Sequence, residues 1–356
     1  MAAPYLMSLA PVPVTKVWGG HQLAPMVDLQ DPPAEPIGEV WSLSALPGRA
    51  CPVVNGALAG LPLDEALAQL EADLPRPFPV LLKMLESTQP MSIQLHPSDA
   101  VARKHGHPCG KSEAWLILKA TPEARVYHGL KAAASDAAGA AAAPPETGDL
   151  AAFVKAARSE PTALTRFLRT FTAREGDVFP VPPGTVHACT GGLVWAEVQQ
   201  SADLTYRLHD WDRTGRELHT EQALEALVPR PHPGVPLSGL TIESGPCTRR
   251  LLWACRAFVM EEIHVSGHWS SPTRGHAFEV LMGLRGKPQV ECRGDAIPLL
   301  PGRAALIPGG LPFAVSSRAA GRIMRVYQAD LESEVRVALA AAGHGPDKIA
   351  DFLYLD

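Results

Sequence analysis

The sequence predicts a mainly β protein built from two double-stranded β-barrels with a few added helices. In the 356-residue chain, 35 prolines and 30 glycines separate short runs of Val, Ile, Leu and Phe, which is typical of strands joined by tight turns. In addition, two parts of the chain share one order of features: a strand, a glycine turn, a second strand and a Pro-Gly turn. One part ends at residues 176–188, and the other contains residues 278–286 and 302–313.

Barrels with this order of features are of the cupin, or jelly-roll, type. Because compact domains usually contain about 100–150 residues, a chain of this length has room for two of them. We place the first domain at residues 1–238, with helical insertions at about 58–75 and 130–171. The second domain then covers residues 239–356 and ends in a helix.

Helices are predicted where apolar residues recur at helical spacing. The spacing predicts helical regions over residues 63–74, 149–171 and 219–227, and a C-terminal helix over residues 331–343. Residues 131–148 form a low-complexity Ala/Pro/Gly segment, which we interpret as a surface connection without chemistry.

Composition argues for a small-molecule role in the cytoplasm. The formal net charge is -5 and no long basic run occurs, whereas nucleic-acid and membrane-surface partners require clustered positive charge. The N-terminal 20 residues lack a basic region and are interrupted by prolines, so we expect neither a signal peptide nor a membrane span. Six scattered cysteines without a Cys-x-x-Cys pair suit reduced thiols in a reducing compartment.

The first candidate site residues lie in an apolar run at residues 78–100. Residues two apart on a strand point to the same face, so Gln94 and His96 are predicted to project together, with Ser92 beside them. The same run contains Lys83. A lysine in an apolar strand is unfavourable unless it serves an anion, and a phosphate dianion would be such a partner.

A second candidate ligand follows a turn. The chain contains the pattern Gly-x5-Pro-x-Gly-x2-His, which is formed by Gly176, Pro182, Gly184 and His187. We expect the Pro-Gly turn to reverse the chain, so that the next strand begins with His187 directed into the barrel.

The third element is the stretch at residues 110–118, where Lys111 and Glu113 alternate and lead into an apolar strand. A carboxylate at such a position needs a cation. One interpretation is an ion pair of Glu113 with Lys111 or an arginine. The other is a metal site, because Gln94, His96, Glu113 and His187 together offer an amide oxygen, a carboxylate and two imidazoles. This set suits Zn²⁺, and less decisively Mn²⁺ or Fe²⁺, and it leaves a coordination position open as catalytic sites do.

The second barrel serves as an internal control. Glu279 and Gly286 keep the spacing of a cupin motif, but Phe313 stands where the first barrel has His187. We therefore predict that the second domain is degenerate and metal-free, and that the first is the metal-binding, catalytic one. His264, His268 and His276 lie at other offsets and are interpreted as surface or loop residues.

Three classes of function fit a cupin metal site. Lys83, Lys111 and Arg207 form a cationic set that suits an enzyme acting on a phosphorylated sugar. A metal-dependent cupin oxygenase and a non-enzymatic sugar-binding cupin are the alternatives. Arg207 lies near three aspartates, so a structural ion pair is also open for it. Glu197 alternates with Gln199 on a strand and is assigned to support of the substrate site.

The residues quoted so far resemble one family. The chain is similar to type I mannose-6-phosphate isomerase in six stretches. They are residues 81–99, the GKSEAW stretch, the PPGTVHACTGG turn, EVQQSADLTYRLHDWDR, KVWGG and GEVWSLS. The resemblance is specific over residues 16 to about 213 and looser beyond. The segment between Tyr127 and Phe171 is shorter than in longer relatives, as in the compact bacterial form, and Ala202 stands where a Ser is usual.

The resemblance implies a metal-dependent aldose–ketose isomerase that interconverts mannose 6-phosphate and fructose 6-phosphate through a cis-enediol. It implies one zinc ion per chain, bound by residues matching Gln94, His96, Glu113 and His187, with Arg207 and Lys111 as catalytic residues. Ser92 and Lys83 would lie near the phosphate or the reacting sugar. A monomer or a homodimer is expected.

Overall fold

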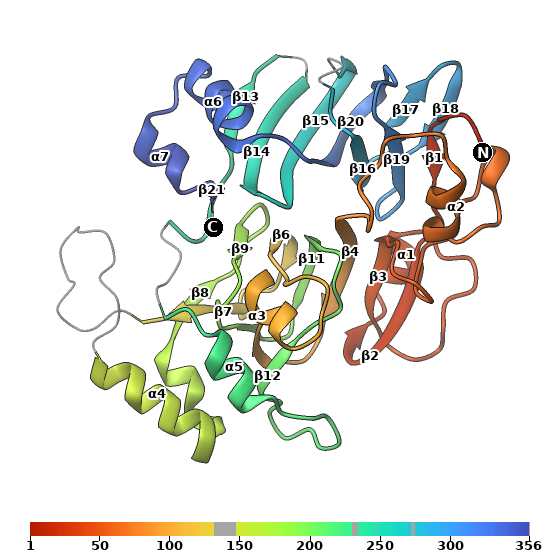
Figure 1. The fold of residues 1–356 in the computed structure, drawn as a ribbon. Coiled ribbons are helices and arrows are strands. Elements are labelled where there is room, and N and C mark those ends of the chain that lie inside the picture. The colour runs from red at the N-terminus through yellow and green to blue at the C-terminus, as the bar shows by residue number, and fades with distance from the viewer. Residues whose placement is uncertain (132–146, 230–233, 246, 272–274, 356) are drawn as a thin grey trace. The chain divides into compact units, whose positions relative to one another are not determined.

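The computed structural model describes residues 1–131, 147–229, 234–245, 247–271 and 275–355 (Figure 1). Strands outnumber helices, which confirms the predicted mainly β fold. The chain divides into two compact units. The first contains Met1–Glu86, Ala196–Ser201 and Ser238–Asp356, and the second contains Ser87–Trp195 and Ala202–Leu237. The division into a metal-binding and a metal-free domain remains a prediction.

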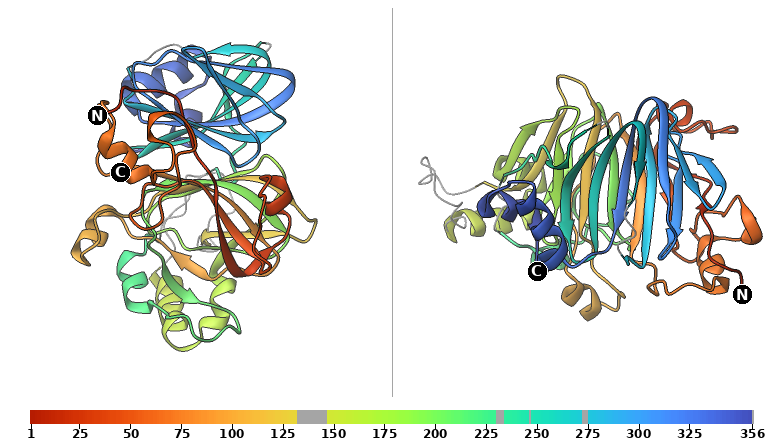
Figure 2. Two further views of the ribbon diagram at one scale, coloured as in Figure 1. Left: turned by 90° about the vertical axis from the view of Figure 1, so that its right-hand side faces the viewer. Right: turned by 90° about the horizontal axis from the view of Figure 1, so that it is seen from above.

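The first unit contains a ten-stranded sheet in which β1, β19, β16, β20, β15, β14 and β13 follow in this order. The β17–β18 hairpin pairs with β20, and β21 pairs with β14. The long antiparallel strands β14, β15 and β20 lie side by side in Figure 2. The strands are β1 (Met7–Ser8), β13 (Leu240–Glu243), β14 (Cys247–Cys255), β15 (Phe258–Ser270), β16 (Phe278–Arg285), β17 (Gln289–Cys292), β18 (Asp295–Pro298), β19 (Ala304–Pro308), β20 (Ala314–Tyr327) and β21 (Leu353–Tyr354).

The same unit contains a second, smaller set of antiparallel strands. They are β2 (Val12–Gly20), β3 (Ile37–Leu43) and β4 (Val80–Ser87), with β3 in the middle. Alternate residues of the long strands, such as Ile263, Leu281 and Ile323, form a core on one face of the ten-stranded sheet. The helices of this unit are short: α1 (Leu23–Met26), η1 (Gly56–Leu58), α2 (Leu63–Gln69), η3 (Leu331–Arg336), α6 (Val337–Ala341) and α7 (Pro346–Ala350).

The second unit contains a five-stranded sheet in the order β12, β5, β10, β7, β8, and a β6–β9 pair. β11 (Leu193–Gln200) belongs partly to each unit. The strands are β5 (Ile93–Leu95), β6 (Glu113–Ala120), β7 (Arg125–Leu130), β8 (Leu168–Thr172), β9 (Val178–Val181), β10 (His187–Cys189) and β12 (Tyr206–His209). The helices are α3 (Asp99–Lys104), α4 (Thr147–Ser159), η2 (Pro161–Phe167) and α5 (Thr220–Ala226).

Two predicted helices end earlier than expected. The first stops at Gln69 because Leu70 is extended and the backbone of residues 69–71 bonds with that of Ala2. The second is broken at Pro161, which lacks the N–H needed to continue a helix. Residues 168–172, also predicted to be helical, form β8 and pair with β7.

The other helical predictions agree better with the structure. The region 219–227 forms α5, and residues 331–341 are helical, as η3 followed by α6. The predicted surface connection at 131–148 falls almost entirely outside the described residues. Within the described part of the chain, every helix is too short or too polar to span a bilayer.

Candidate metal centre

One row of residues crosses the five-stranded sheet of the second unit. Gln94 of β5 stands opposite His187 of β10 on one side and opposite Arg207 of β12 on the other. Cross-strand partners share a face of the sheet. Ile93 and Leu95, which flank Gln94, pack into a core with residues of α4 and α5. The alternation therefore directs Gln94 to the face opposite the helices.

A glycine turn fixes the start of β10. Gly184 has φ of +80°, and its N–H donates to the His96 carbonyl over 2.7 Å. A Cβ at this position would lie 2.6 Å from the Ala226 carbonyl oxygen, so only glycine fits the turn. β10 begins at His187, three residues later. This confirms the expected local geometry of the Pro-x-Gly-x-x-His pattern.

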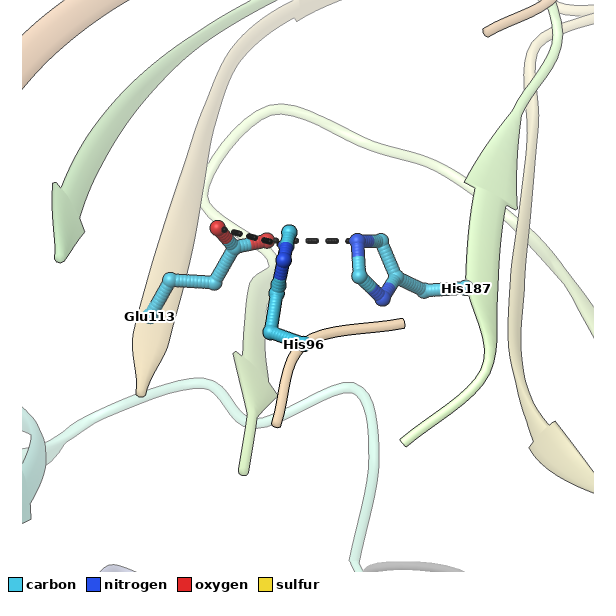
Figure 3. Close-up of side chains that lie close together, drawn as sticks. All are labelled: His96, Glu113 and His187. Carbon is cyan, nitrogen blue, oxygen red and sulfur yellow. Dashed lines mark ion pairs between the residues drawn. The ribbon is translucent and has the colours of Figure 1, made fainter. Parts of the chain in front are cut away.

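Three fully buried side chains converge at this point: His96, Glu113 and His187 (Figure 3). One potential ligand atom from each lies within 4.8 Å of the others. Glu113 Oε2 is 3.2 Å from His96 Nε2, and Glu113 Oε1 is 3.4 Å from His187 Nε2. The three residues come from separate parts of the chain and form a group that can hold a metal ion.

Backbone carbonyls orient both imidazoles. His96 Nδ1 lies 2.8 Å from the Leu204 oxygen, and His187 Nδ1 lies 2.9 Å from the Thr185 oxygen. Since a carbonyl only accepts, each Nδ1 carries the hydrogen, and each Nε2 keeps a lone pair that is available to a metal ion. Burial lowers the pKa of His96 and lowers that of His187 to about 3. Both rings are thus neutral near pH 7, the form that binds metals.

Glu113 is ionised and is surrounded by donors and a cation. Burial raises the pKa of its carboxyl, but the Lys111 ammonium outweighs this and holds the pKa well below its usual value. Lys111 Nζ lies 2.6 Å from Glu113 Oε2, and Trp115 Nε1 donates to Glu113 Oε1 over 3.1 Å. The ion pair considered from the sequence therefore exists. It is compatible with a metal site, because Lys111 and a metal ion would both compensate the buried carboxylate.

Gln94 and Ser92 complete one side of the cluster. Ser92 Oγ donates to Gln94 Oε1 over 2.8 Å, and Gln94 Nε2 lies 3.3 Å from His187 Nε2. The amide thus contacts the group, but through its nitrogen. An amide binds a metal ion through its oxygen, so Gln94 can become a ligand only if the amide turns over.

Arg207 is anchored at the edge of this sheet. Its Nη1 donates to the Glu217 carbonyl over 2.9 Å, and its own carbonyl accepts from His219 N–H over 2.7 Å. Burial, and then the nearby Arg216, lower the pKa of the guanidinium. Arg207 shares a face with Gln94, its partner across the β12–β5 pair. Its catalytic role stays a prediction.

The loop after β12 is organised by Asp210. This buried carboxylate accepts from Arg213 over 2.8 Å and from Arg216 over 2.6 Å. Arg213 also donates to the Pro90 carbonyl, and Trp211 Nε1 donates to the Met91 carbonyl over 2.7 Å. Trp211 adopts φ of +56°, an unfavourable conformation for a bulky residue. The loop that anchors Arg207 is thereby joined to the segment immediately before Ser92.

Two predicted substrate residues, Lys83 and Glu197, lie in the first unit and are buried. Lys83 Nζ pairs with Glu39 over 3.0 Å and lies 4.8 Å from the centre of the Trp41 ring. Trp41 Nε1 also donates to Glu39 over 2.7 Å. The anion that Lys83 serves in this structure is thus a carboxylate of the chain. Sequence reasoning missed Glu39, although it lies in the GEVWSLS stretch quoted for the resemblance.

The second barrel places a guanidinium beside Glu279, the glutamate of its cupin motif. Arg325 is fully buried, and its Nε donates to Glu279 over 2.5 Å while Nη1 donates to Glu261 over 3.0 Å. The two carboxylates therefore share the single positive charge of Arg325. His276 was interpreted as a surface or loop residue. It does lie in a loop, but it is buried and stacks on Tyr327.

The chain matches the family model for the catalytic domain of type I phosphomannose isomerase over residues 6–124. It is 33% identical over 222 residues to the mannose-6-phosphate isomerase of Streptococcus mutans, an alignment that covers 60% of this chain and 65% of that protein. It is 32% identical over 230 residues to the probable mannose-6-phosphate isomerase GmuF of Bacillus subtilis, covering 62% and 67%. The aligned segment therefore spans slightly less than two thirds of the S. mutans relative.

Solved structures of similar fold cover most of the chain. The mannose 6-phosphate isomerase of Bacillus subtilis superposes with a TM-score of 0.74 and 25% identity, covering 90% of this chain and 99% of that one. A mannose 6-phosphate isomerase described as holo and zinc-bound gives a TM-score of 0.67 at 18% identity, covering 91% and 99%. The second likeness supports the fold alone.

Proposed function

The chain belongs to the type I phosphomannose isomerase family, and from this premise we propose that it interconverts mannose 6-phosphate and fructose 6-phosphate. The observation that carries the proposal is the buried group of His96, Glu113 and His187, with the Lys111 ammonium 2.6 Å from Glu113. A metal site alone would fit many cupins. A lysine held directly beside the metal-binding carboxylate adds a group for proton transfer to and from a sugar.

We assign His96, Glu113, His187 and Gln94 as the residues that hold a divalent ion, with Zn²⁺ as the best match to two imidazoles, a carboxylate and an amide. When bound, the ion supplies Lewis-acid polarisation of the sugar carbonyl and of the enediolate oxygens. The Leu204 and Thr185 carbonyls keep both imidazoles in the tautomer that directs Nε2 to the ion. Trp115 orients the carboxylate through its indole N–H.

Lys111 is proposed to move the proton between C1 and C2. Its ammonium lies between Glu113 Oε2 at 2.6 Å and His96 Nε2 at 3.4 Å. A metal ion that neutralised the Glu113 carboxylate would weaken the attraction between Glu113 and the Lys111 ammonium. Arg207 is proposed to stabilise the enediolate charge, and Ser92, Lys83 and Glu197 to bind the substrate. The cytoplasmic location and the monomeric or homodimeric state stay predictions.

The test is a coupled assay of mannose 6-phosphate conversion on three preparations: the purified protein, the chelated protein, and chelated protein supplied with Zn²⁺, Mn²⁺ or Fe²⁺. Activity that disappears with the chelator and returns best with Zn²⁺ supports both the reaction and the ion. A metal-loaded protein without turnover would contradict the proposal. Oxygen consumption would then point to a cupin oxygenase, and sugar binding alone to a binding protein.

A further inference from the structure

A row of polar residues crosses four neighbouring strands of the ten-stranded sheet, outside the metal centre. In register, Thr248 of β14 pairs with His264 of β15, His264 pairs with Arg322 of β20, and Arg322 pairs with Arg285 of β16. The last pairing depends on a register shift between Gly283 and Arg285. The irregularity therefore places two arginines directly opposite each other.

These four residues line a groove of about 410 Å³, together with Ser266 and the backbone at Ala320 and Gly321. Arg285, His264 and Ser266 are exposed, so the groove is accessible from solvent within this unit. Its size lies in the range of small-molecule sites. Its lining contains two guanidinium groups, an imidazole and two hydroxyls, and no carboxylate.

A buried carboxylate supports one side of the row. Glu262 is fully buried, and it accepts from Arg322 Nε over 2.7 Å and pairs with His264 Nε2 at 2.9 Å and with Arg250. Arg322 and His264 are thereby held in fixed orientations. Glu262 carries one negative charge, whereas its partners Arg250 and Arg322 and the Arg285 opposite Arg322 carry three positive charges, so two positive charges are in excess among these four groups.

Glu262 compensates the Arg285–Arg322 pair only from the Arg322 side. Like charges directly opposite each other in a sheet are destabilising. An oxyanion between the two guanidinium groups would replace this repulsion by charge-assisted hydrogen bonds. A dianion would also match the two remaining charges. Hydroxyls at Thr248 and Ser266 offer further donors for a tetrahedral group.

We propose that this groove is a binding site for a phosphate group, either inorganic phosphate or the phosphate of a small metabolite. The site is distinct from the residues assigned to isomerisation, and all of its residues belong to the first unit. Its recognition elements are the opposed Arg285 and Arg322, with His264, Thr248 and Ser266 around them.

The test follows the imidazole signal of His264 by NMR in the full chain with ¹³C-labelled histidine, because this ring lies in the groove. The signal is assigned by its loss in His264→Gln. Inorganic phosphate is titrated at constant ionic strength, with chloride as the comparison salt. We expect a saturable shift with phosphate only. Arg285→Gln should weaken binding about tenfold, the loss of one charge-assisted contact, while Arg285→Lys should retain part of it.

Arg293→Gln, an exposed arginine of the β17–β18 hairpin in the same unit, is the matched control and should bind as the parent does. Unchanged signals of the other histidines verify that Arg285→Gln is folded. The proposal is overturned if the His264 signal does not move with phosphate, or if it moves with equal affinity in Arg285→Gln. Repeating the titration with a sugar phosphate distinguishes the metabolite from the free ion, because the tighter ligand is the physiological class.

Discussion

Gln94 and His187 stand opposite each other in the antiparallel strands β5 and β10, and Gln94 Nε2 lies 3.3 Å from His187 Nε2. A metal ion on His187 would take the lone pair that now faces the amide, and Gln94 would then have to offer its oxygen. We expect Gln94→Leu to lower metal affinity about 10–100-fold, and Gln94→Glu to keep it. Competition with a chromophoric chelator measures both.

The control for this change is Gln289→Leu, because Gln289 is an exposed residue of β17. If Gln94→Leu binds the ion as tightly as the parent chain, Gln94 is not a ligand, and the site consists of the three remaining residues.

Lys111 separates metal binding from chemistry. Its ammonium compensates Glu113 at 2.6 Å, as a metal ion would, so removal of this competing cation should not weaken the metal. We expect Lys111→Met to retain the bound ion and to lower kcat by about 10²–10⁴-fold, the usual contribution of a proton-transfer group. Metal content by mass spectrometry and steady-state kinetics test this together. Lys119→Met, at an exposed position of β6, the strand that follows Lys111, is the control. Loss of the ion in Lys111→Met would instead indicate a structural lysine.

The grouping of His96, Glu113 and His187 could be predicted from the sequence because these residues have local signals. Strand alternation places Gln94 and His96 on one face, and the turn before His187 requires glycine at 184 for a close backbone approach. These rules act over a few residues, so they can be applied without knowing the rest of the fold.

Features that depend on distant residues were not predictable. Leu168–Thr172 has a helical pattern of apolar residues, but its pairing with β7 decides its structure. The sequence likewise contains no sign of the contact of Lys83 with Glu39, two residues brought close by the pairing of β3 and β4. Periodicity within one segment contains no information on either pairing.

The Lys83–Glu39 pair should behave as a stabilising unit. Burial raises the pKa of the Glu39 carboxyl, but Lys83 and Lys16 outweigh burial and lower the pKa well below its usual value. Lys83→Met leaves this carboxylate poorly compensated and should cost about 3 kcal/mol of unfolding free energy. The double variant Lys83→Met/Glu39→Gln should recover at least 1 kcal/mol of that loss, roughly the coupling found for contacting residues.

Lys16→Met tests whether the more exposed of the two lysines that contact Glu39 contributes less to stability. Lys16 pairs with Glu39 at 3.0 Å, but its side chain is 34% exposed, so its loss should cost less than about 1 kcal/mol. Additive effects of the Lys83 and Glu39 substitutions in urea unfolding would contradict the proposed coupling.

Glu262 should make stability depend on pH. Burial raises its pKa, but His264, Arg322 and Arg250 outweigh burial and lower it from 4.5 to about 2. Because the folded pKa is depressed, the contribution is complete well above pH 4.5 and is lost as pH falls toward 2. Near pH 4.5 the unfolded chain binds about half a proton more at this residue. Glu262→Gln should therefore reduce the slope of unfolding free energy by about 0.7 kcal/mol per pH unit. An unchanged slope would show that Glu262 is not ionised in the fold.

Asp210 should position Arg207 without contacting the substrate. It holds Arg213 and Arg216 in the loop whose Glu217 carbonyl accepts from Arg207. Asp210→Asn keeps the shape of the side chain but removes its charge, so the loop should loosen and kcat should fall about tenfold or more, with metal content unchanged. Asp212→Asn, at an exposed position of the same loop, is the control.

The decisive comparison is made in an Arg207→Ala background. If Asp210 acts through Arg207, Asp210→Asn should lower kcat little further there, because coupled residues are non-additive. A tenfold loss in both backgrounds would mean that Asp210 acts on the site by another route. The strained Trp211, whose indole donates to the Met91 carbonyl beside Ser92, would then be the first residue to test.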